Sequence, residues 1–576
     1  MTITPLKVSD VRTIAELPFV AAQAYGDRPA LRFKADGGYV DRTFRDVAET
    51  VDAIARGLID AGIQPGDRVC LLAETGPEWT YAELAVLAAG AILVPIYPSS
   101  SAEECAWVIG NSGASLVICE NAAQVAKVIT LAPTIVLDDG ALDALAGRGD
   151  GHADELKRRR DAIKPGDPSL IIYTSGTTGP PKGCVLTHDN WLALCTIIET
   201  LEHVTADDVV YLFLPLAHVF AQIVQFGCLY AGGTLVYFGG DVKAIVPELA
   251  QARPTFLPSV PRIFEKVYTL FAAAVPAEQL SQAVRVGLEV RRLQRAGLDV
   301  PAPLAAGFAA AEPLFAKVRA VFGGRLKQAL TGAAPISPDV LAFFHAAGVP
   351  VLEGYGMTES SAVGTVTTLE KFKLGTVGVE APGLKVRIAD DGEILMSGGH
   401  IFAGYWRNPE ATAETIVDGW LHTGDLGAID EDGFVTITGR KKDIIITAGG
   451  KNIAPANIEN ELRQSRWISH AVMFGDGRPY PVALLTLDAE EIVPWAAAAG
   501  LPTDVATLVA HPRVTELVAG VVDEVNQRHS RVAQVKRWAL LGRDLTQESG
   551  ELTPTLKVKR KAVAANHTEV IERLYS

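Results

Sequence analysis

A segment of ten residues combines hydroxyl groups, glycines and a lysine in a way that suits a polyphosphate. It follows an apolar run, and residues 174 to 183 read Thr-Ser-Gly-Thr-Thr-Gly-Pro-Pro-Lys-Gly. Glycine lets backbone N–H groups turn toward an anion, the hydroxyls add donors and the lysine adds positive charge. An ordinary surface turn is the alternative, but such a turn does not require this density of hydroxyls beside a lysine. The candidate phosphate-binding residues are Thr174, Ser175, Gly176, Thr177, Thr178, Gly179 and Lys182.

This segment differs from two widespread nucleotide loops. It contains neither Gly-x-x-x-x-Gly-Lys-Ser/Thr, which cradles phosphates in P-loop proteins, nor the Gly-x-Gly-x-x-Gly of dinucleotide-binding folds. A P-loop or kinase-like site is therefore disfavoured.

Four further motifs follow the segment along the chain. They are Gly332-Ala333-Ala334-Pro335, Gly354-Tyr355-Gly356-Met357-Thr358-Glu359, Gly419-Trp420-Leu421-His422-Thr423-Gly424-Asp425 and Gly439-Arg440-Lys441-Lys442-Asp443. Residues 173 to 183 resemble the signature of the adenylate-forming (ANL) superfamily, and the other motifs stand in that family's order. The resemblance covers residues from about 170 to 561. It implies an enzyme that activates a carboxylic acid with ATP.

The resemblance implies roles for the residues around the second motif. Thr358 would bind the α-phosphate, Tyr355 would stack on adenine, and Glu359 would hold Mg²⁺, a hard cation that prefers carboxylate and phosphate oxygen. Thr178 is the second candidate metal ligand. Without the resemblance, Glu359 could equally be an acid that caps the start of a helix. The remaining candidates for nucleotide binding are Gly332, Ala333, Ala334, Glu353, Gly354 and Gly356.

Asp425 resembles the family aspartate that binds the ribose hydroxyls, and Arg440 would be a second contact to ribose or phosphate. A carboxylate suits this role because it only accepts hydrogen bonds. In isolation, an aspartate in Thr-Gly-Asp is more often a turn residue, so this assignment depends on the neighbouring motifs.

A lysine near the C-terminus completes the predicted adenylation site. Lys557 matches the family lysine that spans the oxygens of the carboxylate and the α-phosphate. Leu556 stands where many family members have glycine, so Lys559 is a rival for the same role. A solvated basic turn is the plain alternative.

The resemblance also implies a second half-reaction. Family members rotate a small C-terminal domain about a residue that matches Lys442, which is a hinge motion. After the rotation, Gly449, Gly450 and Lys451 would line the pantetheine channel, where glycine leaves room for a thiol arm.

His218 is a further candidate, counted among the catalytic residues with Thr358, Glu359 and Lys557. It resembles the aromatic gate between the ATP and acyl sites, although a lone histidine in an apolar run is more often a core residue. No His-Glu-x-x-His or similar pattern predicts a zinc site.

Short β-branched runs alternate with Ala- and Leu-rich stretches through the first three hundred residues, for example at 68–72, 92–96, 115–119, 169–173, 209–213 and 234–238. This alternation predicts an α/β fold with parallel sheets covered by helices. A helical insertion is expected at 261–322, and Asp-Gly hairpins after Pro382 indicate a β-rich subdomain. We expect a large domain over 1–438 and a small mobile α/β domain over 439–576.

Only the family resemblance indicates which class of carboxylic acid is the substrate. Residues 262–266, the helical insertion and residues 439–455 look like the long-chain fatty acyl-CoA synthetase branch. The substrates and cofactors would then be a fatty acid, ATP, Mg²⁺ and coenzyme A. Two alternatives stay open: a ligase that passes the acyl group from acyl-AMP to a carrier protein, and a nucleotide-binding protein without turnover. The chain length of the acid is not determined.

The composition excludes some other functions. The formal charge is −15, with 52 basic and 67 acidic residues, which argues against a nucleic-acid partner. Six scattered cysteines without a Cys-x-x-Cys pair suggest reduced thiols and a cytoplasmic location. The N-terminal residues lack the apolar stretch of a secretion signal, and no apolar run reaches the roughly 18 residues of a membrane span. Peripheral membrane contact and the oligomeric state are left open.

Overall fold

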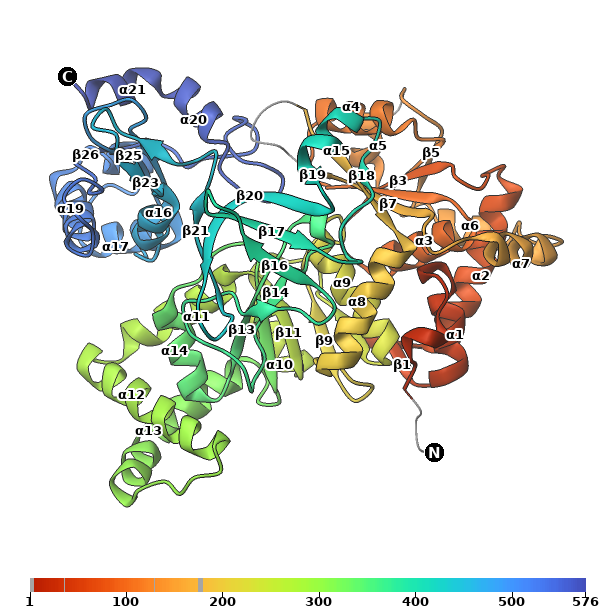
Figure 1. The fold of residues 1–576 in the computed structure, drawn as a ribbon, viewed down its shortest axis with the longest axis horizontal. Helices are drawn as coiled ribbons and strands as arrows, with labels where there is room; N and C mark the ends of the chain where they lie inside the picture. Colours follow the sequence, from red (N-terminus) through yellow and green to blue (C-terminus); the bar gives the residue numbers. More distant parts are fainter. Residues whose placement is uncertain (1–4, 36, 129, 175–179) are drawn as a thin grey trace.

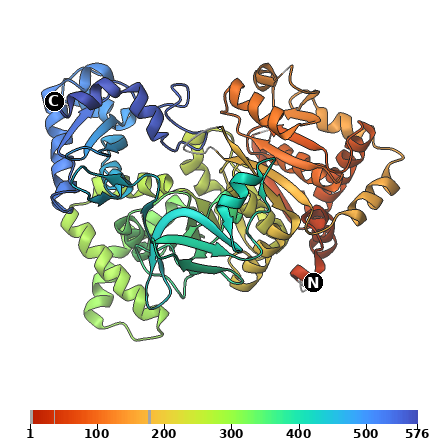
Figure 2. The same ribbon diagram turned by 45° about the horizontal axis from the view of Figure 1, so that its top comes forward.

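The structure is a computed structural model that describes residues 5–35, 37–128, 130–174 and 180–576. Two large sheets and a smaller β-rich part form most of the chain, and the C-terminal residues fold beside them (Figures 1 and 2).

The first sheet has seven strands in the order β18-β8-β7-β4-β3-β5-β6. Strands β3 to β7 pair in parallel, whereas β8 and β18 are antiparallel to their neighbours. The strands are β3 (Arg68–Leu72), β4 (Ile92–Ile96), β5 (Leu116–Cys119), β6 (Thr134–Val136), β7 (Pro168–Thr174), β8 (Lys182–Thr187) and β18 (Gly404–Tyr405). The candidate phosphate-binding segment therefore joins β7 to β8.

The second sheet has nine strands in the order β15-β14-β13-β12-β11-β9-β10-β1-β2. Its six central strands pair in parallel. The strands are β1 (Pro29–Ala35), β2 (Gly38–Thr43), β9 (Val209–Leu212), β10 (Thr234–Tyr237), β11 (Phe256–Ser259), β12 (Gln328–Thr331), β13 (Val351–Tyr355), β14 (Thr365–Val366) and β15 (Val379–Glu380). The predicted motifs 332–335 and 354–359 lie at the carboxyl ends of β12 and β13, the end at which open α/β sheets bind ligands.

Helices accompany both sheets, which confirms the predicted α/β class. They are α1 (Leu17–Tyr25), α2 (Phe44–Asp60), α3 (Pro77–Ala88), α4 (Ala102–Ser112), α5 (Ala122–Val128), α6 (Ala141–Ala146), α7 (Ala153–Ala162), α8 (His188–Leu201), α9 (Val219–Ala231), α10 (Ile245–Ala252) and α14 (Pro338–Ala347). The predicted insertion consists of α11 (Pro261–Ala274), α12 (Ala277–Arg295) and α13 (Ala302–Val321). Helices α12 and α13 project from the body of the molecule (Figure 1).

The predicted β-rich part is a five-stranded sheet in which β16 (Lys385–Ile388) and β17 (Glu393–Ser397) form a hairpin, as do β20 (Trp420–Ile429) and β21 (Val435–Arg440). Strand β19 (Ile416–Val417) completes the sheet, after α15 (Pro409–Thr415). Gly392 and Gly433 each have a φ of 85° at the two Asp-Gly turns, a conformation that glycine adopts without strain. Strand β21 runs through the predicted boundary at residue 438, which stays a prediction.

The residues after β21 form hydrophobic clusters of their own. Their strands are β22 (Ile445–Ile446), β23 (Asn452–Ile453), β24 (Ile468–Phe474), β25 (Val482–Leu487) and β26 (Arg537–Leu540). Their helices are α16 (Pro455–Arg463), α17 (Ala489–Ala498), α18 (Val505–Leu508), α19 (Pro512–Gln527), α20 (Arg560–Asn566) and α21 (Thr568–Arg573).

Two features of the structure were not among the expectations. Strand β8 lies between the candidate phosphate-binding residues and α8, so Thr174 and Lys182 stand in the paired strands of a β-hairpin. The basic run near the C-terminus leads into α20, whose Val563 is buried against β24 and β25.

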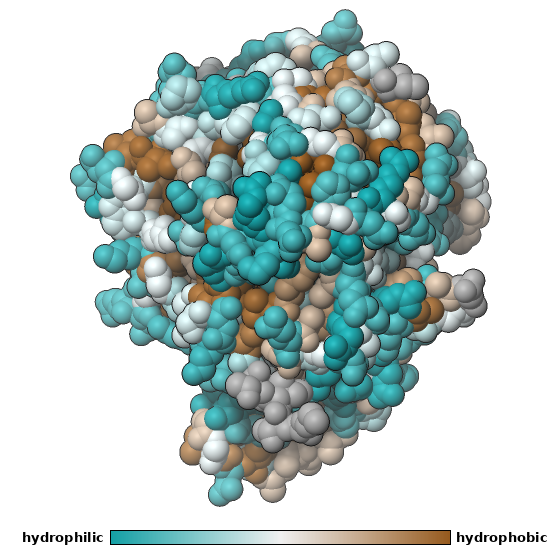
Figure 3. All heavy atoms as spheres, turned by 90° about the vertical axis from the view of Figure 1, so that its right-hand side faces the viewer, coloured by the Kyte–Doolittle hydropathy of each residue, from teal (hydrophilic) through white to brown (hydrophobic). Residues whose placement is uncertain are grey.

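The face on the right of Figure 1 carries mostly hydrophilic side chains, between which apolar ones are scattered (Figure 3). Within the described ranges, the helices are too short or too polar to cross a lipid bilayer.

A buried polar network joins α3 to α9, the helix that begins directly after His218. The Glu83 carboxylate, which is 0% exposed, accepts a hydrogen bond of 2.6 Å from the Gln225 amide. Gln225 in turn accepts one of 2.5 Å from the Thr80 hydroxyl. Burial raises the pKa of Glu83 to about 8, so its neutral form is favoured in the folded protein.

This network predicts a pH-dependent stability. Because the folded-state pKa of Glu83 is raised, the stabilisation is fully present below the unfolded pKa near 4.5 and is lost as the pH rises toward 8. The loss is at most about 1.4 kcal/mol per pH unit. We expect thermal unfolding midpoints to fall more between pH 6 and 8.5 in the parent protein than in Glu83→Gln. Equal falls in both proteins would contradict the assignment.

Candidate active site

The segment Thr174–Lys182 is fixed at both ends by the β7–β8 hairpin. Thr174 and Lys182 are Cα partners in the ladder, and the Lys182 Nζ lies 4.9 Å from the ring centroid of Tyr405. The candidate residues Ser175, Gly176, Thr177, Thr178 and Gly179 lie outside the described residues. The structure therefore places Lys182 and Thr174 but does not test the rest of the segment.

The two glycine-containing motifs after β12 and β13 lie against each other. A Cβ added to Gly332 would lie 3.0 Å from the carbonyl oxygen of Gly354, and one added to Gly356 would lie 2.2 Å from that of Ala362. Ala333 has a φ of 65°, which is uncommon for alanine. Close backbone packing therefore places Gly332 beside Gly354 and Gly356 beside Ala362.

Thr358 and Glu359 begin a short 3₁₀ helix, η4 (Thr358–Ser360), and both are largely buried. The next two residues, Ser361 and Ala362, have φ values of 50° and 72°. Backbone strain of this kind tends to occur at functional sites. The Glu359 carboxylate accepts a hydrogen bond of 2.7 Å from the Tyr405 hydroxyl.

Asp425 is held at both of its carboxylate oxygens. Oδ2 accepts a hydrogen bond of 2.6 Å from the Tyr355 hydroxyl, and Oδ1 accepts one of 2.9 Å from the Arg440 Nε. Asp425 and Arg440 are Cα partners across β20 and β21, which explains their pairing. The structure thus brings three predicted nucleotide-binding residues together.

Glu353 lies on β13, two residues before Tyr355. Its backbone N–H donates a hydrogen bond of 2.7 Å to the Thr367 hydroxyl. Burial raises the pKa of its carboxyl to about 8. A largely neutral carboxyl at this position can donate a hydrogen bond near neutral pH.

Lys557 lies within the electrostatic reach of Glu359, Asp425 and Arg440. Burial lowers the pKa of its ammonium group, and the positive charge of Arg440 lowers it further. The carboxylates of Asp425 and Glu359 raise the same pKa and so act in the opposite direction. Solvent still reaches the side chain, although protein atoms surround most of it. The structure therefore brings Lys557 near three other predicted site residues.

The rival residue, Lys559, has different surroundings. Its Nζ lies 3.6 Å from a carboxylate oxygen of Glu104 in α4, on the opposite side of the domain boundary. The backbone turns back between Glu551 and Lys559. The Lys559 N–H donates a hydrogen bond of 2.7 Å to the Glu551 carbonyl oxygen. Leu556, in this turn, has a φ of 58°, a left-handed conformation that glycine adopts without strain.

His218 caps the N-terminus of α9, and its Nδ1 accepts a hydrogen bond of 3.1 Å from the Phe220 N–H. Burial, together with the charge on Lys557, lowers the pKa of His218 to about 3. The imidazole is therefore neutral at pH 7, and with Nδ1 accepting, the proton is assigned to Nε2.

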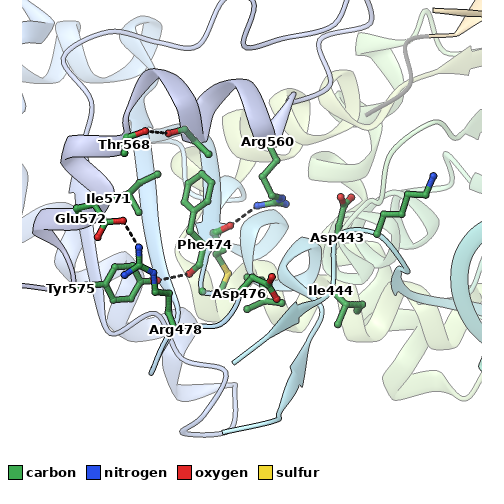
Figure 4. A pocket seen from close by; sticks show the side chains of 15 residues that line it. Asp443, Ile444, Phe474, Asp476, Arg478, Arg560, Thr568, Ile571, Glu572 and Tyr575 are labelled. Carbon is green, nitrogen blue, oxygen red and sulfur yellow. Dashed lines mark hydrogen bonds and ion pairs between the residues drawn. The ribbon is translucent and has the colours of Figure 1, made fainter. Parts of the chain in front are cut away.

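The predicted hinge residue, Lys442, is exposed at the rim of a cavity of about 390 Å³. This cavity lies between the segment 442–445 and helices α20 and α21 (Figure 4). Arg560 lines it and donates two hydrogen bonds, of 2.6 and 2.9 Å, to the Glu459 carboxylate. Arg560 and Glu459 thus hold α20 against α16, and both helices follow the predicted hinge along the chain.

Gly449, Gly450 and Lys451 form the turn between β22 and β23, where Thr447 bonds to Lys451. Among the described residues, no hydrogen bond or ion pair joins this turn to the group around Lys557. Lys557, by contrast, lies within electrostatic reach of three other predicted site residues.

A protein-family model described as "AMP-binding enzyme" matches residues 19–406, and one described as "AMP-binding enzyme C-terminal domain" matches residues 442–576. The chain belongs to the AMP-binding enzyme family. This confirms the predicted membership of the adenylate-forming superfamily.

Several known proteins are similar to this chain over almost its whole length. The long-chain-fatty-acid–CoA ligase FadD15 of Mycobacterium bovis is 37% identical, over 99% of this chain and 98% of its own length. The long-chain-fatty-acid–CoA ligase ACSBG2 of Gallus gallus is 32% identical, over 98% and 81%. A fatty acyl CoA synthetase of Mycobacterium tuberculosis has a similar fold, with a TM-score of 0.64, 22% identity and coverage of 97% and 99%.

The sequence did not predict the contacts of Tyr405 or those of residues 262–266. Tyr405 contacts both Lys182 and Glu359, yet nothing local in its sequence marks it as a site residue. Residues 262–266 were noted only for their family resemblance, and they lie at the contact between the two domains.

That contact has alternating charges. On α11, Arg262 pairs with Asp488 at 2.8 Å and Lys266 pairs with Glu490 at 3.1 Å. Glu265 stands between these two residues on α11. Burial raises the pKa of its carboxyl group, and the nearby positive charge of Arg463 opposes this rise. Partly exposed pairs of this kind contribute only about 0.2–1 kcal/mol each, so they select an orientation without locking it.

We expect a charge reversal at this contact to shift the orientation of the small domain. Because all six cysteines are buried, dyes can be attached at Val417→Cys and Val532→Cys and their distance followed by single-molecule energy transfer. In Arg262→Glu/Lys266→Glu, the population with the parent distance should fall several-fold at low salt and less at high salt.

The matched control is Arg292→Glu, which removes a pair within α12 and should leave the distance unchanged. Combining Lys266→Glu with Glu490→Lys should restore the parent distribution. If the distance distribution of Arg262→Glu/Lys266→Glu equals that of the parent protein, these ion pairs do not set the orientation of the small domain.

Proposed function

We propose that this enzyme joins a long-chain fatty acid to coenzyme A in two steps, with conversion of ATP to AMP and pyrophosphate. The observation that carries the proposal is the meeting of Lys557 with Glu359, Asp425 and Arg440, which come from two domains. The full-length similarity to enzymes named long-chain-fatty-acid–CoA ligases supports the choice of acid and acceptor.

In the first step, a carboxylate oxygen of the fatty acid attacks the α-phosphorus of ATP and pyrophosphate leaves. Two anions must approach each other, so positive charge at the site lowers the barrier. Lys557 supplies it at the carboxylate and α-phosphate, and Lys182 supplies it at the departing pyrophosphate. Thr358 donates to the α-phosphate, and the pair Asp425 and Arg440 holds the ribose.

Adenine binds against the Tyr355 ring and the backbone of Gly332, Ala333, Ala334, Gly354 and Gly356. The close approach of Gly332 to the carbonyl oxygen of Gly354 supports this assignment, because neither residue has a side chain that would keep a ligand from the backbone. His218, neutral and with a proton on Nε2, stands as the gate toward the acyl site.

Glu359 fits a magnesium ion that arrives with ATP. Tyr405 orients its carboxylate, and within the described residues no cluster of three or more metal-ligating side chains is present. A single carboxylate suits Mg²⁺, which takes most of its ligands from phosphate and water. Mg²⁺ would neutralise phosphate charge, and Thr178 is the second proposed ligand.

In the second step, the thiol of coenzyme A attacks the acyl carbonyl carbon and AMP leaves. The small domain, residues 439–576, turns at Lys442 relative to residues 1–438 and brings Gly449, Gly450 and Lys451 to the acyl adenylate. The two family-model matches, which end at 406 and resume at 442, support a division in this region.

We also propose that the enzyme acts in the cytoplasm, since its six cysteines are buried as free thiols. Desolvation raises the pKa of most of them, for example Cys70 to about 12, which keeps these thiols protonated and unreactive.

The function is tested by pyrophosphate release from ATP with fatty acids of graded length, with and without coenzyme A. We expect release that depends on the fatty acid, and acyl-CoA when coenzyme A is present. Release without a thioester would favour transfer to a carrier protein. Absence of release with every acid would contradict an enzymatic function.

Lys557→Ala separates the two steps. We expect it to lower fatty-acid-dependent pyrophosphate release by at least about a hundredfold, because one preorganised charge at the reacting oxygens is lost. Thioester formation from supplied acyl-AMP should stay within about threefold of the parent rate, since that step uses the opposite face of the domain.

Lys559→Ala is the control, because it removes a neighbouring charge that pairs with Glu104 instead. It should lower pyrophosphate release less than tenfold. A larger loss in Lys559→Ala than in Lys557→Ala would assign the catalytic role to Lys559.

A further inference from the structure

Tyr405 is joined to the strand that begins at the phosphate-binding lysine. Strand β18 pairs antiparallel with β8, with Tyr405 opposite Cys184, and the Trp406 N–H donates a hydrogen bond of 2.7 Å to the Gly183 carbonyl. These bonds fix the backbone of Tyr405 next to Lys182, although more than two hundred residues separate them along the chain.

The side chain of Tyr405 contacts two groups of opposite charge. Its hydroxyl donates a hydrogen bond of 2.7 Å to Glu359 Oε1, and the Lys182 Nζ lies 4.9 Å from its ring centroid. A cation at this distance is attracted by the negative face of an aromatic ring. Burial and the Glu359 charge raise the pKa of the Tyr405 phenol, so the hydroxyl remains a donor at neutral pH.

The ring itself is held in place. Phe402 packs edge-on against it, with centroids 4.9 Å apart and an angle of 74° between the planes. The Phe402 N–H also donates a hydrogen bond of 3.0 Å to the Glu359 carbonyl. Residues 402–405 therefore contact both the backbone and the side chain of Glu359.

Tyr405 also affects which partners the two charges can find. Within the described ranges, neither Lys182 nor Glu359 forms an ion pair. A direct pair between them would occupy the ammonium group and the carboxylate that phosphate and metal require. The aromatic ring holds the lysine without taking up its charge, and the hydroxyl leaves one carboxylate oxygen of Glu359 for another ligand.

We propose that Tyr405 is a positioning residue of the nucleotide site, which orients Glu359 through its hydroxyl and holds Lys182 through its ring. This inference rests on the proposed function, since it takes phosphate and magnesium as the ligands of these two groups. It assigns a separate task to each part of one side chain.

Two substitutions separate these tasks. Tyr405→Phe keeps the ring and removes the hydroxyl, and Tyr405→Leu removes both. ATP binding is measured by isothermal titration calorimetry, across a series of Mg²⁺ concentrations and in chelator without Mg²⁺. In Tyr405→Phe, the Mg²⁺ concentration for half-maximal enhancement of ATP binding should rise about tenfold, as is typical when a partner of a metal ligand is lost.

The metal-free measurement isolates the ring. Without Mg²⁺, Tyr405→Phe should bind ATP as the parent does, whereas Tyr405→Leu should bind it several-fold more weakly. Tyr480→Phe is the matched control, because it removes a hydroxyl that donates to the Leu574 carbonyl in the small domain. It should behave as the parent in both series.

A background variant distinguishes positioning from general damage. In Glu359→Gln, adding Tyr405→Phe should cause no further change in the Mg²⁺ dependence, because the carboxylate that the hydroxyl orients is gone. Equal Mg²⁺ dependence in the parent and Tyr405→Phe would overturn the role of Tyr405 while leaving the proposed function standing. Absence of ATP binding by the parent protein would overturn both.

Discussion

The Asp425 carboxylate is held by Tyr355 at one oxygen and by Arg440 at the other, and much of the site depends on this arrangement. The first partner comes from the nine-stranded sheet and the second from the last strand before the hinge. One carboxylate thus fixes the β-rich part against the sheet that carries the adenine motifs. It also fixes the place where the small domain begins.

Charged side chains have different partners at the candidate site and at the domain contact. At the candidate site, Lys182 lies against an aromatic ring, and Lys557 forms no ion pair within the described residues. At the domain contact, opposite charges meet directly, as in Arg262 with Asp488. The first arrangement keeps charge for a ligand, while the second uses charge to choose between orientations that differ little in free energy.

Sequence patterns predicted the elements better than the contacts between them. Buried strands such as β3 and β4 were clear because continuous β-branched runs are typical of parallel sheets. Strand β8 was missed because it is short, follows Pro180 and Pro181 and begins with a lysine and a glycine. Helix α20 was missed because it begins with basic residues and buries only Val563. The grouping of Lys557 with Glu359 was expected only from family resemblance. The contact of Tyr405 with Glu359 depends on how two sheets meet, which local periodicity does not encode.

The short distance along the chain between Arg440 and Lys442 has a mechanical consequence. When a body turns about an axis, each atom moves in proportion to its distance from that axis. If the small domain turns at Lys442, the contact of Arg440 with Asp425 lies two residues from the pivot and would move little, whereas parts of the domain farther from the axis would move more. A pivot at Lys442 would therefore let the small domain change its orientation while the pair of Asp425 and Arg440 stays in place.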